Sequence, residues 1–225
     1  MKQMKNIGIV AYPIDGGYGI PTSYLNFFST FGYVTMIMHN EVDIRKDLDL
    51  LVLPGGPDVD TSRYLDQSDE LSLYIGKPCP FRERFDRVLL PEYVKYGTPI
   101  FGICRGHQSL AVYFGASLFQ DMFHETNNND RKKLVHKVDI LANLGLNNIK
   151  VEPRSFEINS IHHQTVDGLT LPEFSTVLAL HSDDREVEAI SYFPFYPAHT
   201  VQWHPEEIHD EFSITLINHL LLAYD

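Results

Sequence analysis

Short apolar runs alternate with longer amphipathic segments along this chain of 225 residues. Four runs are rich in apolar and β-branched residues, a composition typical of strands that are buried on both faces of a sheet. They are Asn6 to Tyr12, Tyr33 to Met38, Leu48 to Pro54 and Thr98 to Ile103. Because helical patterns separate these runs, we expect a parallel sheet with helices on both faces, and ligands at the carboxyl ends of its strands.

The segments between the strands predict helices. Thr22 to Gly32 carries apolar residues near helical spacing and ends at glycine, a common helix stop. Phe81 to Gly97 repeats this pattern, and Pro91 is expected to kink the helix or split it in two. Glu207 to Ala223 places apolar side chains on one helical face, which predicts a terminal helix packed against the sheet.

The second half of the chain has a less regular pattern. The polar tract Asn127 to Lys133 indicates a solvated loop, and the alternating run Leu134 to Ile140 indicates a strand. Two further runs, Ser175 to Asp184 and Glu186 to Phe193, are typical of a hairpin that turns near Asp183. No internal repeat interrupts this organisation, so we expect one domain that covers residues 1–225.

Charge and cysteine content exclude some classes of protein and some partners. Eighteen basic residues face thirty acidic ones, and the formal net charge of −12 would repel a nucleic-acid backbone. No apolar stretch approaches membrane-spanning length, so we expect no membrane partner and a cytoplasmic location. The two cysteines, Cys79 and Cys104, form no disulfide framework and should remain thiols.

Cys104 occupies a tight corner between a strand and a helix. The pattern Gly-x-Cys-x-Gly has the form of a nucleophile elbow, in which flanking glycines permit close backbone approach. A helix N-terminus favours the thiolate, which is the attacking species, and the amide of Arg105 is positioned to stabilise an oxyanion. The alternative interpretation is a buried structural cysteine between two packing glycines, and the motif alone does not separate the two.

His204 and Glu206 supply a candidate base and its orienting carboxylate. Residues two apart in an extended segment project to the same face, and Pro205 restricts the backbone of His204. This is the arrangement that a catalytic triad needs. Taken alone, the pair is better explained as a surface histidine beside a solvated glutamate.

A third feature follows the predicted strand that ends near Pro54. The sequence Pro-Gly-Gly-Pro exposes backbone N–H groups at a strand end, and Gly56 is the candidate for a second oxyanion donor. In isolation this stretch indicates only a turn. The combination of elbow, base and glycine turn therefore carries the prediction of an active site.

These motifs also resemble a known family. The series "LPGGPDVD", "FGICRGHQ", "NSIHHQ", "VEAI" and "VQWHPE" is similar to the class I glutamine amidotransferase-like superfamily, and most closely to its γ-glutamyl-γ-aminobutyrate hydrolase-like branch, peptidase C26. The resemblance implies an α/β, flavodoxin-like three-layer sandwich with a mostly parallel central sheet, in a single domain. It implies that Cys104 is the nucleophile, His204 the base and Glu206 its orienting partner. Gly56 and Arg105 would supply the oxyanion-hole amides.

The same resemblance implies a substrate pocket and a reaction. The pocket residues would be Gln108, His162, His163 and Gln164. The expected reaction is cleavage of the γ-glutamyl amide bond of a small compound through a γ-glutamyl thioester, which releases glutamate and an amine. Neither a metal nor a cofactor is expected, since the adjacent histidines lack further residues at ligand spacing.

Two other functions remain open from the sequence. One is the glutaminase component of an amidotransferase, which would deliver ammonia to a separate synthase partner. The other is a binding or sensing module that has kept the pocket and lost catalysis. The sequence determines neither the leaving amine nor the oligomeric state, and a homo-oligomer is compatible with it.

Overall fold

The computed structural model describes residues 4–65, 76–122, 130–141 and 154–222 of the chain. Its centre is an eleven-stranded sheet, and the strands in one half of that sheet are parallel. In spatial order, the parallel strands are β4 (Gly32–Ile37), β1 (Lys5–Val10), β5 (Leu50–Leu53), β6 (Ile100–Ile103) and β13 (Ala198–Val201). The strands β5, β6 and β13 are buried along their whole length, so the centre of the sheet lies in the core.

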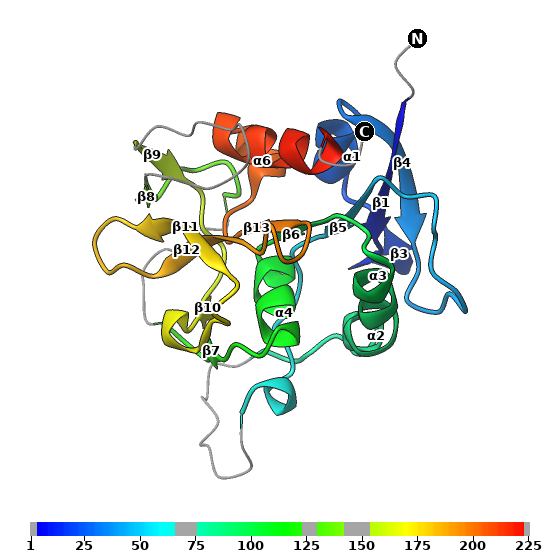
Figure 1. Cartoon of the computed structure of the whole chain (residues 1–225), viewed down its shortest axis with the longest axis horizontal. Helices are drawn as coiled ribbons and strands as arrows, with labels where there is room; N and C mark the ends of the chain where they lie inside the picture. The colour runs from blue at the N-terminus through cyan, green and yellow to red at the C-terminus, as the bar shows by residue number, and fades with distance from the viewer. Residues whose placement is uncertain (1–3, 66–75, 123–129, 142–153, 223–225) are drawn as a thin grey trace.

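Helices cover both faces of the sheet (Figure 1). One face carries α1 (Thr22–Phe28) and α6 (Glu211–Leu222), and the other carries α2 (Pro80–Arg84), α3 (Leu90–Tyr96) and α4 (Arg105–Tyr113). Helices α1, α3 and α6 turn apolar side chains toward the strands, as amphipathic helices on a sheet do. Helix α2 instead buries Arg82 and Glu83, and α4 is buried on all sides from Arg105 to Val112. The predicted three-layer α/β sandwich is confirmed.

The helix around Pro91 differs from the predicted kink. A π-helical stretch, η2 (Phe85–Leu89), joins α2 to α3, and Pro91 lies in the first turn of α3. A proline inside a helix cannot donate a hydrogen bond and its ring crowds the carbonyl four residues before it, and the widened π-helical turn just before Pro91 accommodates both effects. The segment therefore continues through the proline with one widened region, a feature often found near functional sites.

The other half of the sheet is antiparallel. Its strands are β12 (Val187–Ser191), β11 (Thr176–His181), β8 (His136–Ile140) and β9 (Ser155–Ile158). The pairing of β11 with β12 confirms the predicted hairpin, and β8 confirms the predicted strand that ends at Ile140. Residues 127–129 of the predicted polar loop lie outside the described residues.

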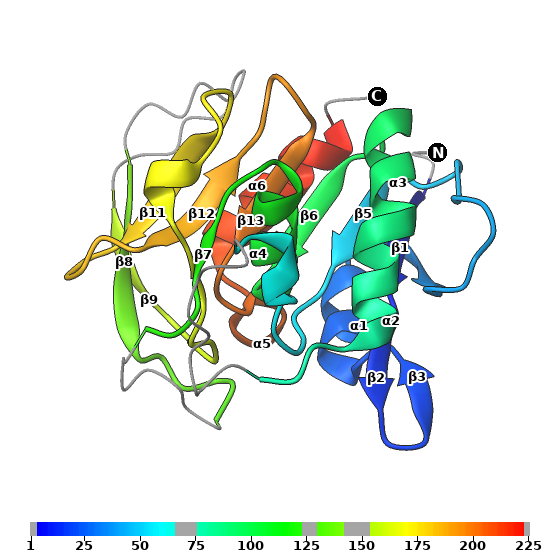
Figure 2. The same ribbon diagram turned by 90° about the horizontal axis from the view of Figure 1, so that it is seen from below.

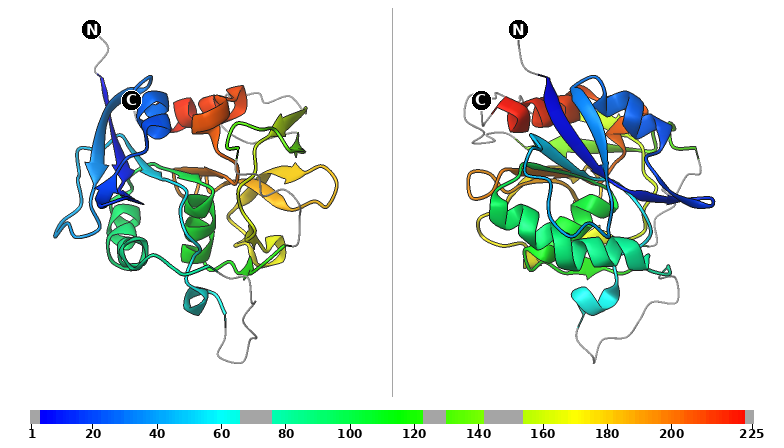
Figure 3. Two further views of the ribbon diagram at one scale, coloured as in Figure 1. Left: turned by 180° about the vertical axis from the view of Figure 1, so that it is seen from behind. Right: turned by 90° about the vertical axis from the view of Figure 1, so that its right-hand side faces the viewer.

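Short elements complete the fold. They are β7 (Leu118–Phe119), β10 (Thr165–Val166), η1 (Thr61–Arg63), η3 (Gly168–Thr170), α5 (Pro205–Ile208) and the two-stranded hairpin β2 (Tyr12–Ile14) with β3 (Gly17–Gly19). The β2–β3 hairpin projects from the body of the molecule, at the end of the sheet where α5 lies (Figures 2 and 3). This end is also where β5, β6 and β13 finish.

The core is divided by the sheet into two apolar clusters. Phe28, Trp203 and Leu216 are fully buried between the sheet and helices α1 and α6, and Phe85 and Tyr93 are fully buried on the opposite face. Burial of side chains of this size contributes about 1.5–3 kcal/mol each. In the described part of the chain, none of the helices combines the length and the apolar character needed to cross a bilayer.

Candidate active site

Three neighbouring strands bring the predicted catalytic features to one edge of the sheet. β6 lies between β5 and β13, and all three are parallel. Cys104 follows β6, the Pro54–Gly56 turn follows β5, and His204 follows β13. Because parallel strands end at the same edge, residues about 50 and 100 positions from Cys104 in the sequence meet there.

Cys104 adopts a backbone conformation that is unusual for a residue with a side chain. Its φ of 50° and ψ of −106° place it in a strained region at the turn between β6 and α4. Its N–H donates to the carbonyl oxygen of Val201 (2.9 Å), and its own carbonyl accepts from the N–H of Gln108 (3.1 Å). These bonds hold the turn in the geometry of a nucleophile elbow.

Gly106 explains why the elbow can be so tight. A β-carbon at this position would lie only 2.0 Å from the carbonyl oxygen of Leu53 at the end of β5. Glycine therefore allows the first turn of α4 to press directly against the neighbouring strand. The N–H of Arg105, in the first turn of α4, has no acceptor within the helix, so Arg105 stays a candidate oxyanion donor.

His204 is held between a carboxylate and the cysteine sulfur. Its Nδ1 lies 2.7 Å from Oε1 of Glu206, and both residues are buried. The sulfur of Cys104 lies within hydrogen-bonding reach of the same imidazole. Burial alone would lower the pKa of His204, but the negative charges of Glu206 and Cys104 raise it to about 10. The arrangement therefore favours the imidazolium form of His204.

The turn after β5 packs directly on this histidine. A β-carbon at Gly55 would lie 2.8 Å from Cε1 of His204 and 3.6 Å from Cβ of Cys104. The Gly55 N–H donates to the hydroxyl of Tyr24 (2.9 Å), and that hydroxyl bonds to Glu206. Burial, followed by the charge of Glu206, raises the pKa of Tyr24 well above its usual value, so the hydroxyl keeps its proton. Since the Gly55 amide is occupied, Gly56 is the candidate oxyanion donor of this turn.

Comparison with known proteins agrees with this geometry. The family model described as Peptidase C26 matches residues 22–206, a span that includes the elbow, the glycine turn and the His-Glu pair. The chain belongs to the peptidase C26 family. It is therefore also a member of the class I glutamine amidotransferase-like group, whose enzymes are amidotransferases and hydrolases.

Relatives of this peptidase C26 chain include both kinds of enzyme. It is 30% identical over 206 residues to a subunit of the glutamine-hydrolysing GMP synthase of Thermoplasma volcanium, a match that covers 90% of this chain and 85% of that protein. It is 29% identical over 182 residues to γ-glutamyl-γ-aminobutyrate hydrolase of Escherichia coli, covering 76% and 68%. The crystal structure of a glutamine amidotransferase from Thermotoga maritima is similar in fold, with a TM-score of 0.60 at 18% identity over 99% of this chain and 83% of that one.

Gln108 and Gln164 connect the elbow helix of the C26 fold to the wall of the site. Nε2 of Gln108 donates to the main-chain oxygen of Gln164 (2.8 Å), and the same oxygen lies 3.1 Å from Nδ1 of His162. The side chain of Gln164 accepts from the N–H of Val59 (3.3 Å) and donates to the hydroxyl of Tyr64 (3.0 Å). Gln164 therefore joins three segments, and its side chain is engaged on both sides.

His163 lies between two carboxylates. Its Nε2 is 3.0 Å from Oδ2 of Asp58, and its Nδ1 is 3.2 Å from Oδ1 of Asp121. The hydrogen bond to Asp58 raises the pKa of His163, burial opposes this, and Asp121 adds to the increase. In this position the imidazole joins the loop after β5 to the segment after β7, and both of its nitrogens have protein partners.

His162 lies in a buried electrostatic cluster. Burial lowers the pKa of His162 to about 4, so this imidazole is neutral, and it lies within electrostatic reach of both Glu188 and His204. Burial alone would raise the pKa of Glu188, but the hydrogen bond from His136 keeps it below its usual value. A neutral His162 can donate or accept a hydrogen bond beside His204, the candidate base.

Three further residues at the site were not singled out from the sequence: Tyr24, Arg82 and Asn159. Asn159 opens the motif "NSIHHQ", so its proximity to two histidines was a usable signal. Arg82 stands next to Glu83 in an otherwise amphipathic helix, and its burial could not be read from the pattern. Tyr24 lies 80 residues before the nucleophile, and only the packing of α1 against α5 brings it to Glu206.

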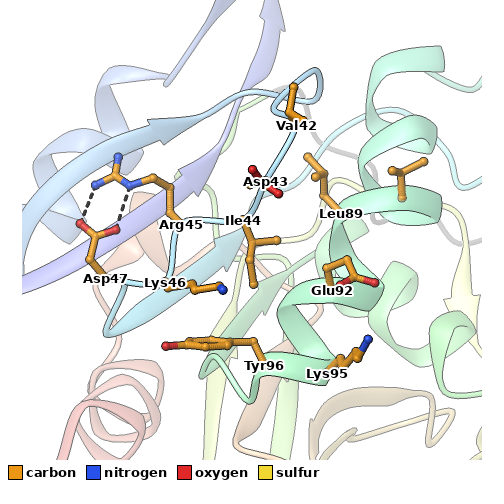
Figure 4. A pocket seen from close by; sticks show the side chains of 11 residues that line it. Val42, Asp43, Ile44, Arg45, Lys46, Asp47, Leu89, Glu92, Lys95 and Tyr96 are labelled. Atoms are coloured by element: carbon orange, nitrogen blue, oxygen red, sulfur yellow. Dashed lines mark hydrogen bonds and ion pairs between the residues drawn. The ribbon is translucent and has the colours of Figure 1, made fainter.

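A cavity elsewhere on the molecule carries none of these catalytic features. It measures about 870 Å³ and lies between the segment 42–47 and helix α3 (Figure 4). Its charged side chains partly neutralise one another, as in the Arg45–Asp47 ion pair of 2.7 Å. None of Cys104, His204 and Glu206 lines this cavity, so the candidate active site is the one at the strand ends around Cys104. Among the described residues, no group of three or more His, Cys, Asp or Glu side chains is arranged to hold a metal ion.

Proposed function

We propose that this chain is a cysteine-dependent hydrolase that cleaves the γ-glutamyl amide bond of a small γ-glutamyl compound and releases glutamate and an amine. The observation that carries the proposal is the constellation at the strand ends. Cys104 stands on a strained elbow within reach of His204, which Glu206 holds at 2.7 Å. Similarity to a γ-glutamyl-γ-aminobutyrate hydrolase supports the substrate class.

In the first step, the Cys104 sulfur attacks the carbonyl carbon of the γ-amide. The carbonyl oxygen becomes negatively charged and accepts hydrogen bonds from the amides of Gly56 and Arg105. His204 then transfers its proton to the amine nitrogen as the carbon–nitrogen bond breaks. The products of this step are the free amine and a γ-glutamyl thioester on Cys104, with His204 neutral.

In the second step, neutral His204 removes a proton from a water molecule that attacks the thioester carbonyl. The carbon–sulfur bond breaks, glutamate leaves and the sulfur returns as a thiolate beside the imidazolium. Glu206 stabilises the imidazolium and fixes the ring orientation in both steps. Apart from the γ-glutamyl substrate, the two steps consume only water.

The glutamyl part of the substrate is proposed to lie against Gln108 and His162. Both residues are adjacent to the Gln164 main chain, and His162 is close to the catalytic histidine. The side chains of His163 and Gln164 bond to protein groups, as does Nε2 of Gln108, and we propose that His163 and Gln164 contribute by holding the wall of this pocket. Recognition of the α-amino and α-carboxylate groups would thus use polar atoms on two segments.

The decisive experiment is a panel of γ-glutamyl compounds, glutamine included, that is scored for glutamate release. Wild type should release glutamate from at least one compound, and the variant Cys104→Ala should release none while keeping its circular dichroism spectrum. Cys79→Ala is the matched control, because Cys79 is the other buried thiol and lies outside the site. Mass spectrometry of quenched reactions should show a glutamyl adduct on the peptide that contains Cys104. Turnover by Cys104→Ala would remove the nucleophile assignment.

A second function is favoured by the similarity to the GMP synthase component, which extends over 90% of this chain. In that function the same triad would hydrolyse glutamine and deliver ammonia to a separate synthase partner. Glutamine would then be the preferred compound in the panel, and its hydrolysis would rise sharply when the partner is added. Efficient cleavage of a larger γ-glutamyl amide by the isolated chain would instead favour the hydrolase.

A further inference from the structure

The helix between residues 80 and 89 carries a run of buried charges beneath the active site. Arg82, Glu83 and Asp86 are each less than 10% exposed, although charged side chains are almost never fully buried without partners. They lie on α2 and the π-helical stretch η2, on the sheet face that also carries α4. Their partners are the two segments that supply the proposed oxyanion donors.

Arg82 binds the main chain of the glycine turn. Its Nη1 donates to the carbonyl oxygen of Gly55 and its Nη2 to that of Pro54, both at 2.7 Å. In a planar trans peptide the C=O and the following N–H point in opposite directions. A Gly55 carbonyl directed at Arg82 therefore turns the N–H of Gly56 away from the guanidinium.

The opposite side of the turn is also held. The Gly55 N–H donates to Tyr24, so the peptide groups on both sides of Gly55 have a buried side-chain partner. A β-carbon at Gly56 would lie 3.0 Å from Nη1 of Arg82 and 3.2 Å from Cδ of Arg105. The two arginine side chains therefore pack against the same face of Gly56.

The neighbouring acidic residues hold the second donor segment. Arg105 donates from Nη2 to Glu83 (2.6 Å) and from Nη1 to Asp86 (2.8 Å). Arg63 also donates to Asp86, at 2.8 Å. Burial alone would raise the pKa of Asp86, but Arg105, Arg63 and Arg82 hold it below its usual value, so it stays ionised. Three guanidiniums thus face two carboxylates.

We propose that Arg82 is a positioning residue that orients the Gly56 amide for the oxyanion, and that Glu83 and Asp86 orient the Arg105 amide from the same helix. One rigid element thereby aligns both donors, which come from different strands. The excess of positive charge in the cluster adds a favourable field at the point where the oxyanion forms. This inference rests on the proposed function, because it assigns the support of the same oxyanion hole.

The test compares Arg82→Met, which removes both hydrogen bonds, with Arg82→Lys, which can keep one. Each variant is assayed with the γ-glutamyl compound that wild type cleaves fastest. Cys104 is separately labelled with iodoacetamide, because alkylation consumes the thiolate and forms no oxyanion. Arg84→Met is the matched control, since Arg84 is an exposed arginine on the same helix.

Loss of one oxyanion donor costs about 10²–10³-fold in kcat, and Arg82→Met should approach the lower end of that range. The KM of both Arg82 variants should change little. The kcat of Arg82→Lys should fall between those of Arg82→Met and wild type. The rate of Cys104 labelling in both variants should equal that of wild type. Arg84→Met should match wild type in every assay. If Arg82→Met does not fold, kcat and the rate of Cys104 labelling are compared in Arg82→Lys alone.

Two results would overturn the inference while leaving the hydrolase proposal intact. One is wild-type kcat in both Arg82 variants. The other is a fall in kcat that is matched by an equal fall in the rate of Cys104 labelling, which would indicate general damage to the site. A wild-type chain that releases glutamate from no compound in the panel would overturn the proposed function itself, and this inference with it.

Discussion

Asn159 holds the main chain of His204 from both sides. The N–H of His204 donates to Oδ1 of Asn159 (2.9 Å), and Nδ2 of Asn159 donates to the carbonyl oxygen of His204 (3.2 Å). The same Nδ2 donates to the main-chain oxygen of Arg131. His204, the proposed base, is therefore fixed through its backbone by Asn159 and through its ring by Glu206.

The variant Asn159→Asp tests this role. The new carboxylate would still accept from the His204 N–H, but it would repel the carbonyl oxygens that Nδ2 now binds. A displacement of His204 by about 1 Å is expected to lower kcat roughly 10²-fold. Steady-state kinetics with a cleaved γ-glutamyl compound provide the measurement, and Asn218→Asp, on the exposed side of α6, is the control. Equal kcat in the two variants would mean that Asn159 does not position the base.

Gly55→Ala tests the close packing of the glycine turn on the histidine. The added methyl group would lie 2.8 Å from Cε1 of His204, closer than van der Waals contact permits, so the turn or the imidazole must move. We expect about a 10²-fold fall in kcat. Gly17→Ala is the matched control, because a β-carbon there meets no atom within 4 Å. Wild-type activity in Gly55→Ala would show that the site adapts to the larger side chain.

The dependence of acylation on pH should follow the protonation of His204. Its pKa is raised to about 10, so the imidazolium that protonates the leaving amine persists through neutral pH and is lost as the pH rises through about 10. Glu206→Gln removes a carboxylate that raises this pKa, and the fall in rate should therefore begin at lower pH. Single-turnover rates measured across pH for wild type and Glu206→Gln provide the check.

Glu207→Gln is the control for this profile, since it removes the adjacent carboxylate of α5 and leaves the His204 partner in place. Its alkaline limb should coincide with that of wild type. An unshifted limb in Glu206→Gln would contradict the assignment of His204 as the titrating group.

His163 should contribute more to stability than to catalysis. The pKa of His163 is raised by Asp58 and Asp121, so its stabilising charge is fully present below the ordinary histidine pKa and is lost as the pH rises through the raised value. His163→Asn should lower the free energy of unfolding by about 1–2 kcal/mol at mildly acidic pH. The difference from wild type should shrink as the pH increases. Urea unfolding at a series of pH values measures this effect.

His209→Asn is the matched control for the unfolding series. His209 is exposed and has a φ of 55°, a conformation that asparagine tolerates. The free energy of unfolding of His209→Asn should remain close to that of wild type at every pH. If His163→Asn left the unfolding free energy unchanged and raised KM instead, His163 would be assigned to direct contact with the substrate.

The sequence by itself determined the local features. The apolar runs predicted β1, β5 and β6 to within a few residues, because strands buried on both faces need continuous apolar side chains. The position of β4 was predicted as closely, but its expected burial on both faces was wrong, since β4 lies at the sheet edge with Tyr33 and Met36 exposed. The same local logic located the corner at Cys104 and the His-Glu spacing, since each depends on residues that are adjacent in the chain. The residue types of the candidate triad could therefore be named before any fold was known.

Only the tertiary structure decided which strands are neighbours. β13 contains His199 and Thr200, so it lacks the pattern of a buried strand, yet both residues are fully buried. Nε2 of His199 bonds to His219 and Oγ1 of Thr200 bonds to His107, at 2.8 Å in each case, and such pairings with distant residues leave no local signal. The position of β13 beside β6 brings His204 to Cys104.

The tertiary structure also decided which residues support the glycine turn. Tyr24 and Arg82 act on the glycine turn through hydrogen bonds that span 31 and 27 residues of sequence. The amphipathic pattern of a helix does not distinguish a buried arginine from an exposed one, because the groups that the guanidinium binds lie in other parts of the chain. Chain folding supplied those partners, and with them the hydrogen bonds on which the proposed oxyanion site rests.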